Sequence, residues 1–243
     1  MDDQRRPLGL AEAAELLGVD QSTLRAQVHR GRLRAFKVGR DWLVTDEEID
    51  RYRREVQGQR ASKKSSEPVV LTDGVVTLRA LEPGDAPAVF AACQDALIAR
   101  FLPIPCPYTE ANAREFAAVC QADWEGDSER PFAITDAQTG EFRGVIARHL
   151  RAEHRAEVGY WLAPGARGRG FATRALRLVR DWSFDVTGLV RLELFTHPEN
   201  HASGRVAERA GLAREGVRRG WRIGRDGNPQ DRVFYAMLRG DPR

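Results

Sequence analysis

The chain has 243 residues, of which 42% are apolar, so it exceeds one typical domain and can build a sizeable hydrophobic core. Its 38 Lys and Arg residues against 35 Asp and Glu residues leave a net charge of only +3, so a nucleic-acid surface would have to be a local patch. The N-terminus carries acids where a secretory signal has an apolar core, and no apolar run approaches the ~20 residues of a membrane span. We therefore expect a cytoplasmic protein with two domains and no membrane contact.

Metal and disulfide chemistry are not expected. Cys93, Cys106 and Cys120 are odd in number and widely spaced, which predicts neither a disulfide framework nor a cysteine zinc site. We expect all three to be packing residues. His197 and His201 have the spacing of a metal pair, but a proline stands between them and no third ligand is near in the sequence. The sequence therefore predicts no metal.

A polar stretch divides the chain. Residues 57–67, QGQRASKKSSE, contain one alanine and otherwise only polar residues or glycine, whereas both flanks show apolar periodicity. This composition predicts an N-terminal domain over residues 1–56, a linker over 57–68 and a larger domain over 69–243.

The N-terminal domain reads as a small winged helix. Apolar residues at helical spacing predict a first helix that ends at Gly18, and Asp20 can cap a second helix carrying Leu24 and Val28. A hairpin over residues 33–44 and a third helix should follow. Helix, tight turn, helix and hairpin together suit a DNA-binding unit.

Basic residues gather on the second helix and the hairpin of this domain. No acid lies between Asp20 and Asp41, whereas the outer helices carry the acids. Such a run is often only a solvated face, but here it coincides with the elements that enter a groove and contact phosphates. We predict DNA contacts at Ser22, Thr23, Arg25, Arg30, Arg32, Lys37 and Arg40.

Residues 8–52 resemble the excisionase and MerR-like helix-turn-helix family. The matching features are AAELLGV, the ST pair that starts the second helix, RGRL, KVGR and the terminal DEEI. The resemblance implies binding of double-stranded DNA, with the second helix in the major groove and the wing on the backbone. The small size of the unit favours a homodimer.

The larger domain alternates strands and helices in the order of a mixed α+β sheet flanked by helices, with one helix between two central strands. Alternating apolar runs predict strands over 75–81, 132–135, 141–147, 156–162, 190–196, 217–223 and 233–238. Helical spacing predicts helices over 83–93, 109–120, from 171 onward and over 202–210.

Residues 164–176, PGARGRGFATRAL, place a glycine–arginine turn between a strand and a helix. Free amides at a helix start form an anion site, and glycines let the anion approach the backbone. The turn lacks the lysine pattern of a P-loop. It does not follow the first strand of a parallel unit, as the glycine motif of a dinucleotide-binding fold does. It also leads into an amphipathic helix, unlike a disordered RGG segment. The turn therefore predicts a diphosphate site.

The same turn fits the [QR]-x-x-G-x-[GA] loop of the GNAT N-acetyltransferases, and the resemblance extends from Val76 to near the C-terminus. GYWL before the loop and PENHAS after it stand in the family's order, and the chain is most similar to the Rim-type branch, which acetylates N-termini of ribosomal proteins. The resemblance implies acetyl-CoA as the acetyl donor, held between two splayed strands. The cofactor-binding residues that it implies are Trp161, Leu162, Ala163, Arg167, Gly168, Arg169, Gly170, Phe171, Ala172, Thr173 and Asn200.

The resemblance also points to two catalytic residues, each with a competing role. Glu157 stands where several GNAT enzymes keep a base, but it can instead pair with Arg155 or Arg191, and Glu193 is a rival base. Ser203, at the end of the N-x-x-S pattern, can donate a proton to the leaving sulfur or simply cap a helix.

These residues favour an acetyl-CoA-dependent N-acetyltransferase that acts on a primary amine and carries a DNA-binding module. The alternative is a DNA-binding transcription regulator whose acetyltransferase-like domain senses acetyl-CoA or another ligand without turnover. Fold alone does not choose between them, whereas retained acid and base candidates favour the enzyme. The acceptor stays open among a protein N-terminus, an aminoglycoside-type antibiotic, a polyamine and a small amino compound.

Overall fold

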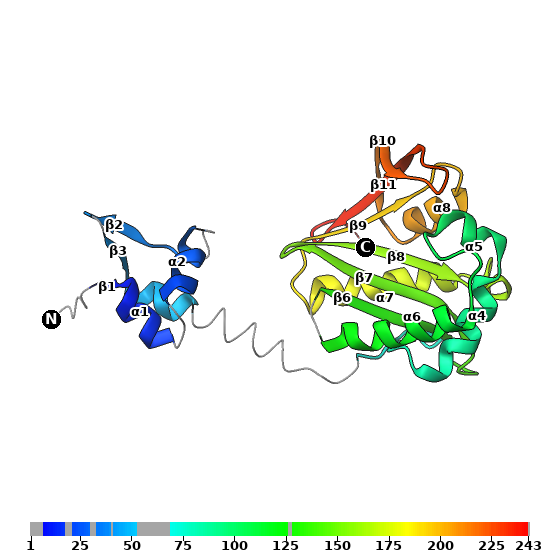
Figure 1. The fold of residues 1–243 in the computed structure, drawn as a ribbon, viewed down its shortest axis with the longest axis horizontal. Helices are drawn as coiled ribbons and strands as arrows, with labels where there is room; N and C mark the ends of the chain where they lie inside the picture. The colour runs from blue at the N-terminus through cyan, green and yellow to red at the C-terminus, as the bar shows by residue number, and fades with distance from the viewer. Residues whose placement is uncertain are drawn as a thin grey trace. The chain divides into compact units, whose positions relative to one another are not determined.

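The computed structural model describes residues 7–17, 21–29, 33–39, 41–52, 69–125 and 128–242. The chain divides into two compact units, residues 1–65 and 66–243 (Figure 1). The predicted helix boundaries at Gly18 and Asp20 and the predicted linker over 57–68 lie outside the described residues. No helix in the described ranges is long and apolar enough to cross a membrane.

The N-terminal unit packs helices against a small sheet. Its helices are α1 (Leu10–Leu17), α2 (Gln21–His29) and a helical stretch over residues 46–52, and its strands are β1 (Leu8–Gly9), β2 (Phe36–Val38) and β3 (Asp41–Val44). The sheet order is β1-β3-β2, so the predicted hairpin gains a short strand that the sequence did not reveal. Two residues are too few to show a period of two.

A buried carboxylate joins the start of the hairpin region to the third helix of this unit. Glu48 accepts hydrogen bonds from the backbone amide of Arg34 at 2.8 Å and from its guanidinium at 3.0 Å. Arg51 donates to the same carboxylate. These partners, Arg51 above all, lower the pKa of Glu48 to about 2, so the contacts remain ionic at neutral pH.

The larger unit is built on an eight-stranded sheet of order β10-β11-β9-β8-β7-β6-β5-β4. Every neighbouring pair is antiparallel except β8 and β9. The strands are β4 (Leu71–Thr72), β5 (Val76–Arg79), β6 (Glu129–Asp136), β7 (Phe142–Ala152), β8 (Arg155–Leu162), β9 (Arg191–Thr196), β10 (Ala213–Ile223) and β11 (Pro229–Leu238).

Helices cover both faces of this sheet (Figure 1). On one face α7 (Phe171–Asp185) packs its buried side over the central strands, and on the other lie α4 (Ala86–Cys93) and α6 (Glu110–Ala122). The other α-helices described in this unit are α5 (Ala96–Phe101) and α8 (His201–Arg209). Because α7 connects the parallel strands β8 and β9, the predicted mixed sheet with a helix between two central strands is confirmed.

Two features of the larger unit differ from the sequence-based expectation. The helix α5 was not predicted, because six residues show too little periodicity, although Asp95 caps it by accepting from the amides of Leu97 and Ile98. Cys93 and Cys120 are buried as expected, whereas Cys106 is exposed and so is not a packing residue.

Candidate active site

The parallel strands β8 and β9 pair over only three residues and then separate. Their last paired residues are Glu157 and Glu193, although β8 continues to Leu162 and β9 to Thr196. Beyond that point β8 keeps its bonds to β7, and β9 keeps its bonds to β11. The inner edges of two neighbouring strands therefore face a gap within the sheet, which can hold an extended ligand.

At the far end of this gap, the turn before α7 offers free backbone amides. Gly168 and Gly170 adopt left-handed φ angles of 74° and 83°, which only glycine accepts readily. The first helical amide that donates to a backbone carbonyl belongs to Arg174, which bonds Gly170 at 3.1 Å. In the described part of the chain the six preceding amides, 168–173, have no acceptor, so at the start of this 15-residue helix they are free to donate to an anion.

Arg167 ties this turn to α5. Its guanidinium donates to the two carboxylate oxygens of Asp95 at 2.7 and 3.2 Å and to the carbonyl of Leu162 at 3.3 Å. The hydrogen bond from Arg167 lowers the pKa of Asp95. The side chain of Arg167 therefore holds the turn in place, and its charge is already balanced by Asp95.

An apolar pocket runs from the turn along β8. It is walled by side chains along the length of α5 and by the start of α8, and Gly168 marks its end at the turn. Trp161 also packs against the cluster under α4 and α6, and its ring lies 5.8 Å from that of Phe142. The lining residues are Leu97, Ile98, Phe101, Leu102, Tyr160, Trp161, Leu162, Arg167, Gly168, Asn200, Ala202 and Ser203.

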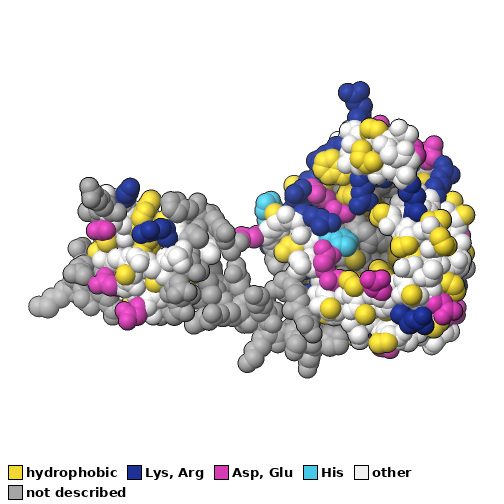
Figure 2. All heavy atoms as spheres, viewed as in Figure 1, with side chains coloured by type: hydrophobic (Ala, Val, Ile, Leu, Met, Phe, Trp, Pro, Cys, Tyr) yellow, Lys and Arg dark blue, Asp and Glu magenta, His cyan; other side chains and the backbone are white. Residues whose placement is uncertain are grey.

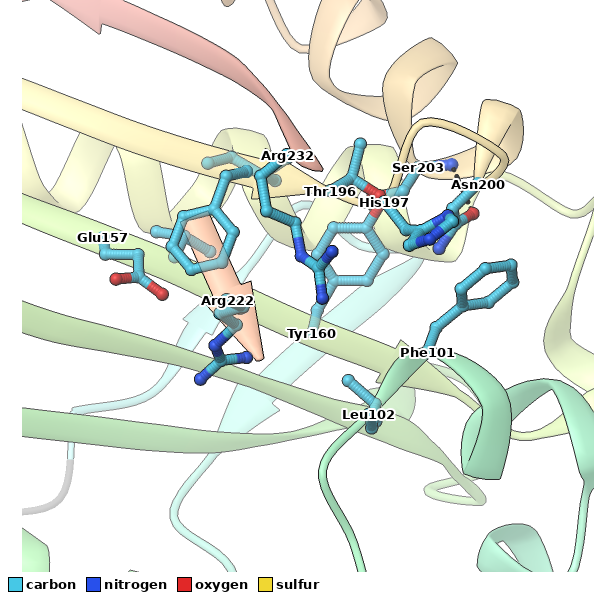
Figure 3. Close-up of a pocket in the computed structure, with 14 residues that line it drawn as sticks. Phe101, Leu102, Glu157, Tyr160, Thr196, His197, Asn200, Ser203, Arg222 and Arg232 are labelled. Carbon is cyan, nitrogen blue, oxygen red and sulfur yellow. Dashed lines mark hydrogen bonds between the residues drawn. The ribbon is translucent and has the colours of Figure 1, made fainter. Parts of the chain in front are cut away.

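A second, more polar pocket continues from the apolar one toward the β10–β11 hairpin (Figure 3). It adds Glu157 from β8, residues 194–197 of β9 and the turn after it, and Arg222 and Arg232 from the hairpin. Five residues line both pockets, namely Phe101, Leu102, Tyr160, Asn200 and Ser203. These shared residues mark the junction of the two pockets.

Ser203 lies at this junction and does not cap the helix. The N-cap of α8 is Asn200, whose side-chain oxygen accepts from the amide of Ser203 at 3.1 Å. The hydroxyl of Ser203 instead lies 2.9 Å from the hydroxyl of Tyr160, which reaches it from β8. Burial raises the pKa of Tyr160 to about 12, so that phenol keeps its proton at neutral pH.

The two candidate bases differ in their surroundings. Glu157 lines the polar pocket and accepts from Arg151 at 3.0 Å. Glu193 is only 7% exposed, and its two oxygens accept from Arg155 at 3.1 Å and from Arg191 at 2.6 Å. The arginines that could have paired with Glu157 thus pair with Glu193, which favours Glu157 as the group that can reach a substrate.

Sequence reasoning missed several residues of the cleft. Tyr160 stood inside the quoted GYWL motif, and its neighbours Trp161 and Leu162 drew attention in its place. Phe101 belongs to the unpredicted α5, and Arg222 comes from a strand with no recognised motif. Arg232 lies in DRVFYAMLRGD, which supports the family resemblance but gives the arginine no role. Some of the predicted cofactor residues do not line either pocket. Phe171 and Ala172 are buried. The guanidinium of Arg169 lies 5.2 Å from the centre of the Phe171 ring.

The N-terminal unit presents part of the predicted DNA surface. Ser22 and Arg25 on α2 are exposed, and so is Lys37 on β2, whose ammonium lies 5.9 Å from the Trp42 ring centre. Of the other predicted contacts, Arg30, Arg32 and Arg40 lie outside the described residues, and so does the side chain of Thr23. Within the described ranges no group of three or more His, Cys, Asp or Glu side chains could hold a metal ion.

The family models match both units. The model described as acetyltransferase (GNAT) domain covers residues 76–213, more than half of the chain, and a helix-turn-helix domain model covers residues 8–56. The protein belongs to the GNAT acetyltransferase family. It is an N-acetyltransferase with an N-terminal helix-turn-helix domain, as the two resemblances had predicted.

Known proteins similar to this chain cover its larger unit. The uncharacterized N-acetyltransferase YoaA of Bacillus subtilis is 27% identical over 174 residues, which is 71% of this chain and 97% of that protein. A ribosomal alpha-N-protein acetyltransferase in complex with coenzyme A has a TM-score of 0.63 at 20% identity, over 71% of this chain and 98% of that one. A microcin self-immunity acetyltransferase in complex with acetyl-CoA and AMP has a TM-score of 0.61 at 19% identity, over 69% and 93%. These two structures show the fold.

Proposed function

We propose that the cleft between β8 and β9 binds acetyl-CoA and that the amine acceptor occupies the polar pocket beside Glu157. The observation that carries the proposal is the run of six amides over 168–173 that have no acceptor in the described chain. A diphosphate fits such a run, because its oxygens accept several N–H bonds without ordering any side chain. The apolar pocket that starts at this turn suits the arm between the diphosphate and the thioester.

Glu157 in the polar pocket and Ser203 at the junction supply the proton transfers. Acetyl-CoA supplies an acetyl thioester, whose carbonyl carbon bonds to the amine nitrogen as its bond to sulfur breaks. Glu157 takes the proton that the amine loses, directly or through water, and a strand amide near Trp161 stabilises the charge on the carbonyl oxygen. Ser203 gives its hydroxyl proton to the departing sulfur, and solvent replaces that proton. The products are an amide and the free thiol.

Tyr160 is a positioning residue for Ser203 in this proposal. Because its phenol is protonated, it can donate to the hydroxyl oxygen of Ser203 across the 2.9 Å that separates them. The proton of Ser203 then remains directed away from Tyr160 and available to the sulfur. The hydrogen bond from the backbone amide of Ser203 to the side-chain oxygen of Asn200 fixes the start of α8 and holds the hydroxyl at the junction.

Acetyl transfer is tested by following release of the CoA thiol with a panel of primary amines. The proposal expects release that depends on an amine and saturates with acetyl-CoA. Tight acetyl-CoA binding without release for every amine would contradict turnover and favour a ligand-sensing regulator.

We further propose that the N-terminal unit binds duplex DNA through α2 and the β2–β3 hairpin. The exposed cations Arg25 and Lys37 on these elements support it. In anisotropy titrations of the full chain, log Kd should rise linearly with log salt, and Arg25→Gln with Lys37→Gln should reduce that slope by roughly 2. Arg114→Gln, which removes an exposed positive charge from α6 of the other unit, is the control. Absence of salt-dependent binding to any duplex would point to a protein-interaction module.

A further inference from the structure

The β10–β11 hairpin brings positive charge to the acceptor side of the cleft. Arg222 and Arg232 line the pocket that contains Glu157 and also the adjoining pocket next to the hairpin. Figure 3 shows the guanidinium of Arg232 extending into the pocket, between Glu157 on one side and Tyr160 on the other. In Figure 2, Lys and Arg side chains gather on the part of the larger unit that carries β10 and β11 and border a hollow in that face.

Arg232 is buried without a counter-ion in the described chain. Its side chain is 8% exposed, and its guanidinium donates to the carbonyl of Asp231 at 2.7 Å and to the amide oxygen of Gln230 at 3.1 Å. Both acceptors are neutral, and no described carboxylate lies within 4 Å. A buried cation of this kind is costly in the free protein, which favours an anion that would neutralise it.

Neighbouring arginines add to the imbalance. Arg218 is the register partner of Arg232 across the hairpin, so two positive residues face each other directly. Arg222, whose guanidinium lies 5.7 Å from the Phe195 ring centre, forms no ion pair with a described carboxylate. Burial and the charge of Arg222 both lower the pKa of Arg232, which is consistent with a site that lacks its anion.

The acids around these pockets are already engaged. Glu157 is the acidic residue among those that line the polar pocket, and it accepts from Arg151 at 3.0 Å. Asp226 lines the adjoining pocket and accepts from the backbone and side chain of Asn228. Arg100, also in that pocket, pairs with Glu199. In the polar pocket, the side chains whose charge is not balanced by a described ion pair are therefore Arg222 and Arg232.

We propose that the acetyl acceptor carries a carboxylate or a phosphate close to its amine, and that Arg222 and Arg232 bind this anion while Glu157 faces the amine. The inference rests on the proposed function and narrows its acceptor class. Guanidinium groups suit both anions because their planar N–H donors match two oxygens at once. A polyamine is disfavoured, because each further ammonium group would enter a pocket that already has an excess of positive charge.

The test compares acceptors that differ only in the anion. Alanine and alaninamide form the carboxylate arm, phosphoethanolamine and ethanolamine form the phosphate arm, and spermidine represents a polycation. Two quantities are measured: kcat/KM from thiol release, and binding to the CoA-saturated protein by calorimetry. Saturation with CoA keeps phosphate groups off the amides of the turn. We expect the anionic member of at least one arm to exceed its neutral partner by about tenfold or more in both quantities.

The results separate this inference from the proposed function. Equal binding of both members in both arms, or a preference for spermidine, overturns the anion site even when thiol release is rapid. Anion-dependent binding without thiol release from any amine supports the anion site and contradicts acetyl transfer. The arm that shows the preference identifies the anion as a carboxylate or a phosphate.

Variants locate the effect on the hairpin. Arg232→Gln should reduce the preference for the anionic member to about 1, and Arg222→Gln, at an exposed position that is less prone to misfolding, should reduce it several-fold. Arg219→Gln removes the same charge from β10 at an exposed residue that lines neither pocket and should keep the full preference. A preference that survives both pocket variants places the anion elsewhere and contradicts the assignment.

Discussion

The two halves of the cleft present different groups to their ligands. In the cofactor half, the end of β8 and the turn with its backbone amides lie in one nearly continuous stretch, 160–173, and α5 and the start of α8 complete the apolar wall. The acceptor half is made of charged side chains from β8 and the β10–β11 hairpin, which lie far apart in the sequence. Ligand binding by backbone amides depends on the φ angles of a short segment. Ligand binding by side chains depends on the tertiary structure that brings distant residues together. Substitutions that restrict the backbone should therefore weaken the binding of acetyl-CoA. Substitutions that remove a charge should change the binding and turnover of the acceptor.

The largest effect is expected from a charge change in the acceptor half. Glu157→Gln keeps the size of the side chain but removes its ability to accept a proton, so kcat should fall by roughly 10²–10⁴. The loss should be smaller at high pH, where more of the amine is already neutral. Affinity for acetyl-CoA, measured by calorimetry, should be unchanged.

Glu141→Gln is the control for that variant, because Glu141 is an exposed glutamate that pairs with an arginine outside the cleft. It should leave the whole pH–rate profile intact. A Glu157→Gln enzyme with the wild-type profile would remove Glu157 as the base and return attention to Glu193 or an ordered water.

A backbone change in the cofactor half should come next in size. Gly170→Val forces a branched residue into a φ of 83°, and the turn must distort to relieve it. A Cβ at this position meets no atom within 4 Å, so the effect arises from the φ angle and not from a clash within the protein. The Kd for acetyl-CoA should rise by roughly 10–100-fold, whereas Gly165→Val, in the same turn with φ outside the left-handed region, should change it little. Equal affinities for wild type and Gly170→Val would place the diphosphate elsewhere.

A smaller effect is expected at the junction of the halves. Tyr160→Phe removes one hydrogen bond to Ser203, so kcat should fall by about tenfold with no change in the basic limb of the pH profile. If Tyr160 acts only through Ser203, the double variant with Ser203→Ala should be no slower than Ser203→Ala alone. Additive losses in this double-mutant cycle would show that the two hydroxyls act independently.

The smallest effect should come from the link between turn and α5. Asp95→Asn keeps a good helix cap and removes the charge that holds Arg167, so the KM for acetyl-CoA should rise by about two- to fivefold. Because Arg167 lowers the pKa of Asp95, the pair stays ionised at neutral pH and weakens only in acid. Asp95→Ala, which also loses the cap, should be worse. Identical KM values for Asp95→Asn and wild type would mean that the cap alone positions the turn.

The amide turn of the cofactor half could be predicted from the sequence because its information is local, whereas the α5 wall of the same pocket was not predicted. Gly168 and Gly170 signalled the turn, and the apolar spacing from Phe171 signalled the helix that begins there. The acceptor half could not be predicted in the same way. Nothing near Arg232 in the sequence indicates that it faces Glu157, because strand order and register bring them together only in the folded sheet.

The competing roles of Ser203 and Glu157 show the same limit. Sequence placed Ser203 near a helix start, but only the structure shows that Asn200 is the cap and that Tyr160 is the partner of the serine hydroxyl. Arginine pairing was the alternative role considered for Glu157, with Arg155 or Arg191 as the partner, but the arginine that bonds it is Arg151, which comes from the antiparallel neighbour β7.

The three-residue pairing of β8 with β9 makes the larger sheet two half-sheets joined by a short seam. An extended ligand whose amide groups bond to the free edge of β8 would continue that seam as an additional strand would. Binding of a ligand in the cleft would then also complete the hydrogen bonding between the two half-sheets. Ligand binding would then slow amide hydrogen exchange along residues 158–162 and on the β9 side of the gap. Each amide that becomes protected would report one hydrogen bond formed to the ligand or across the gap.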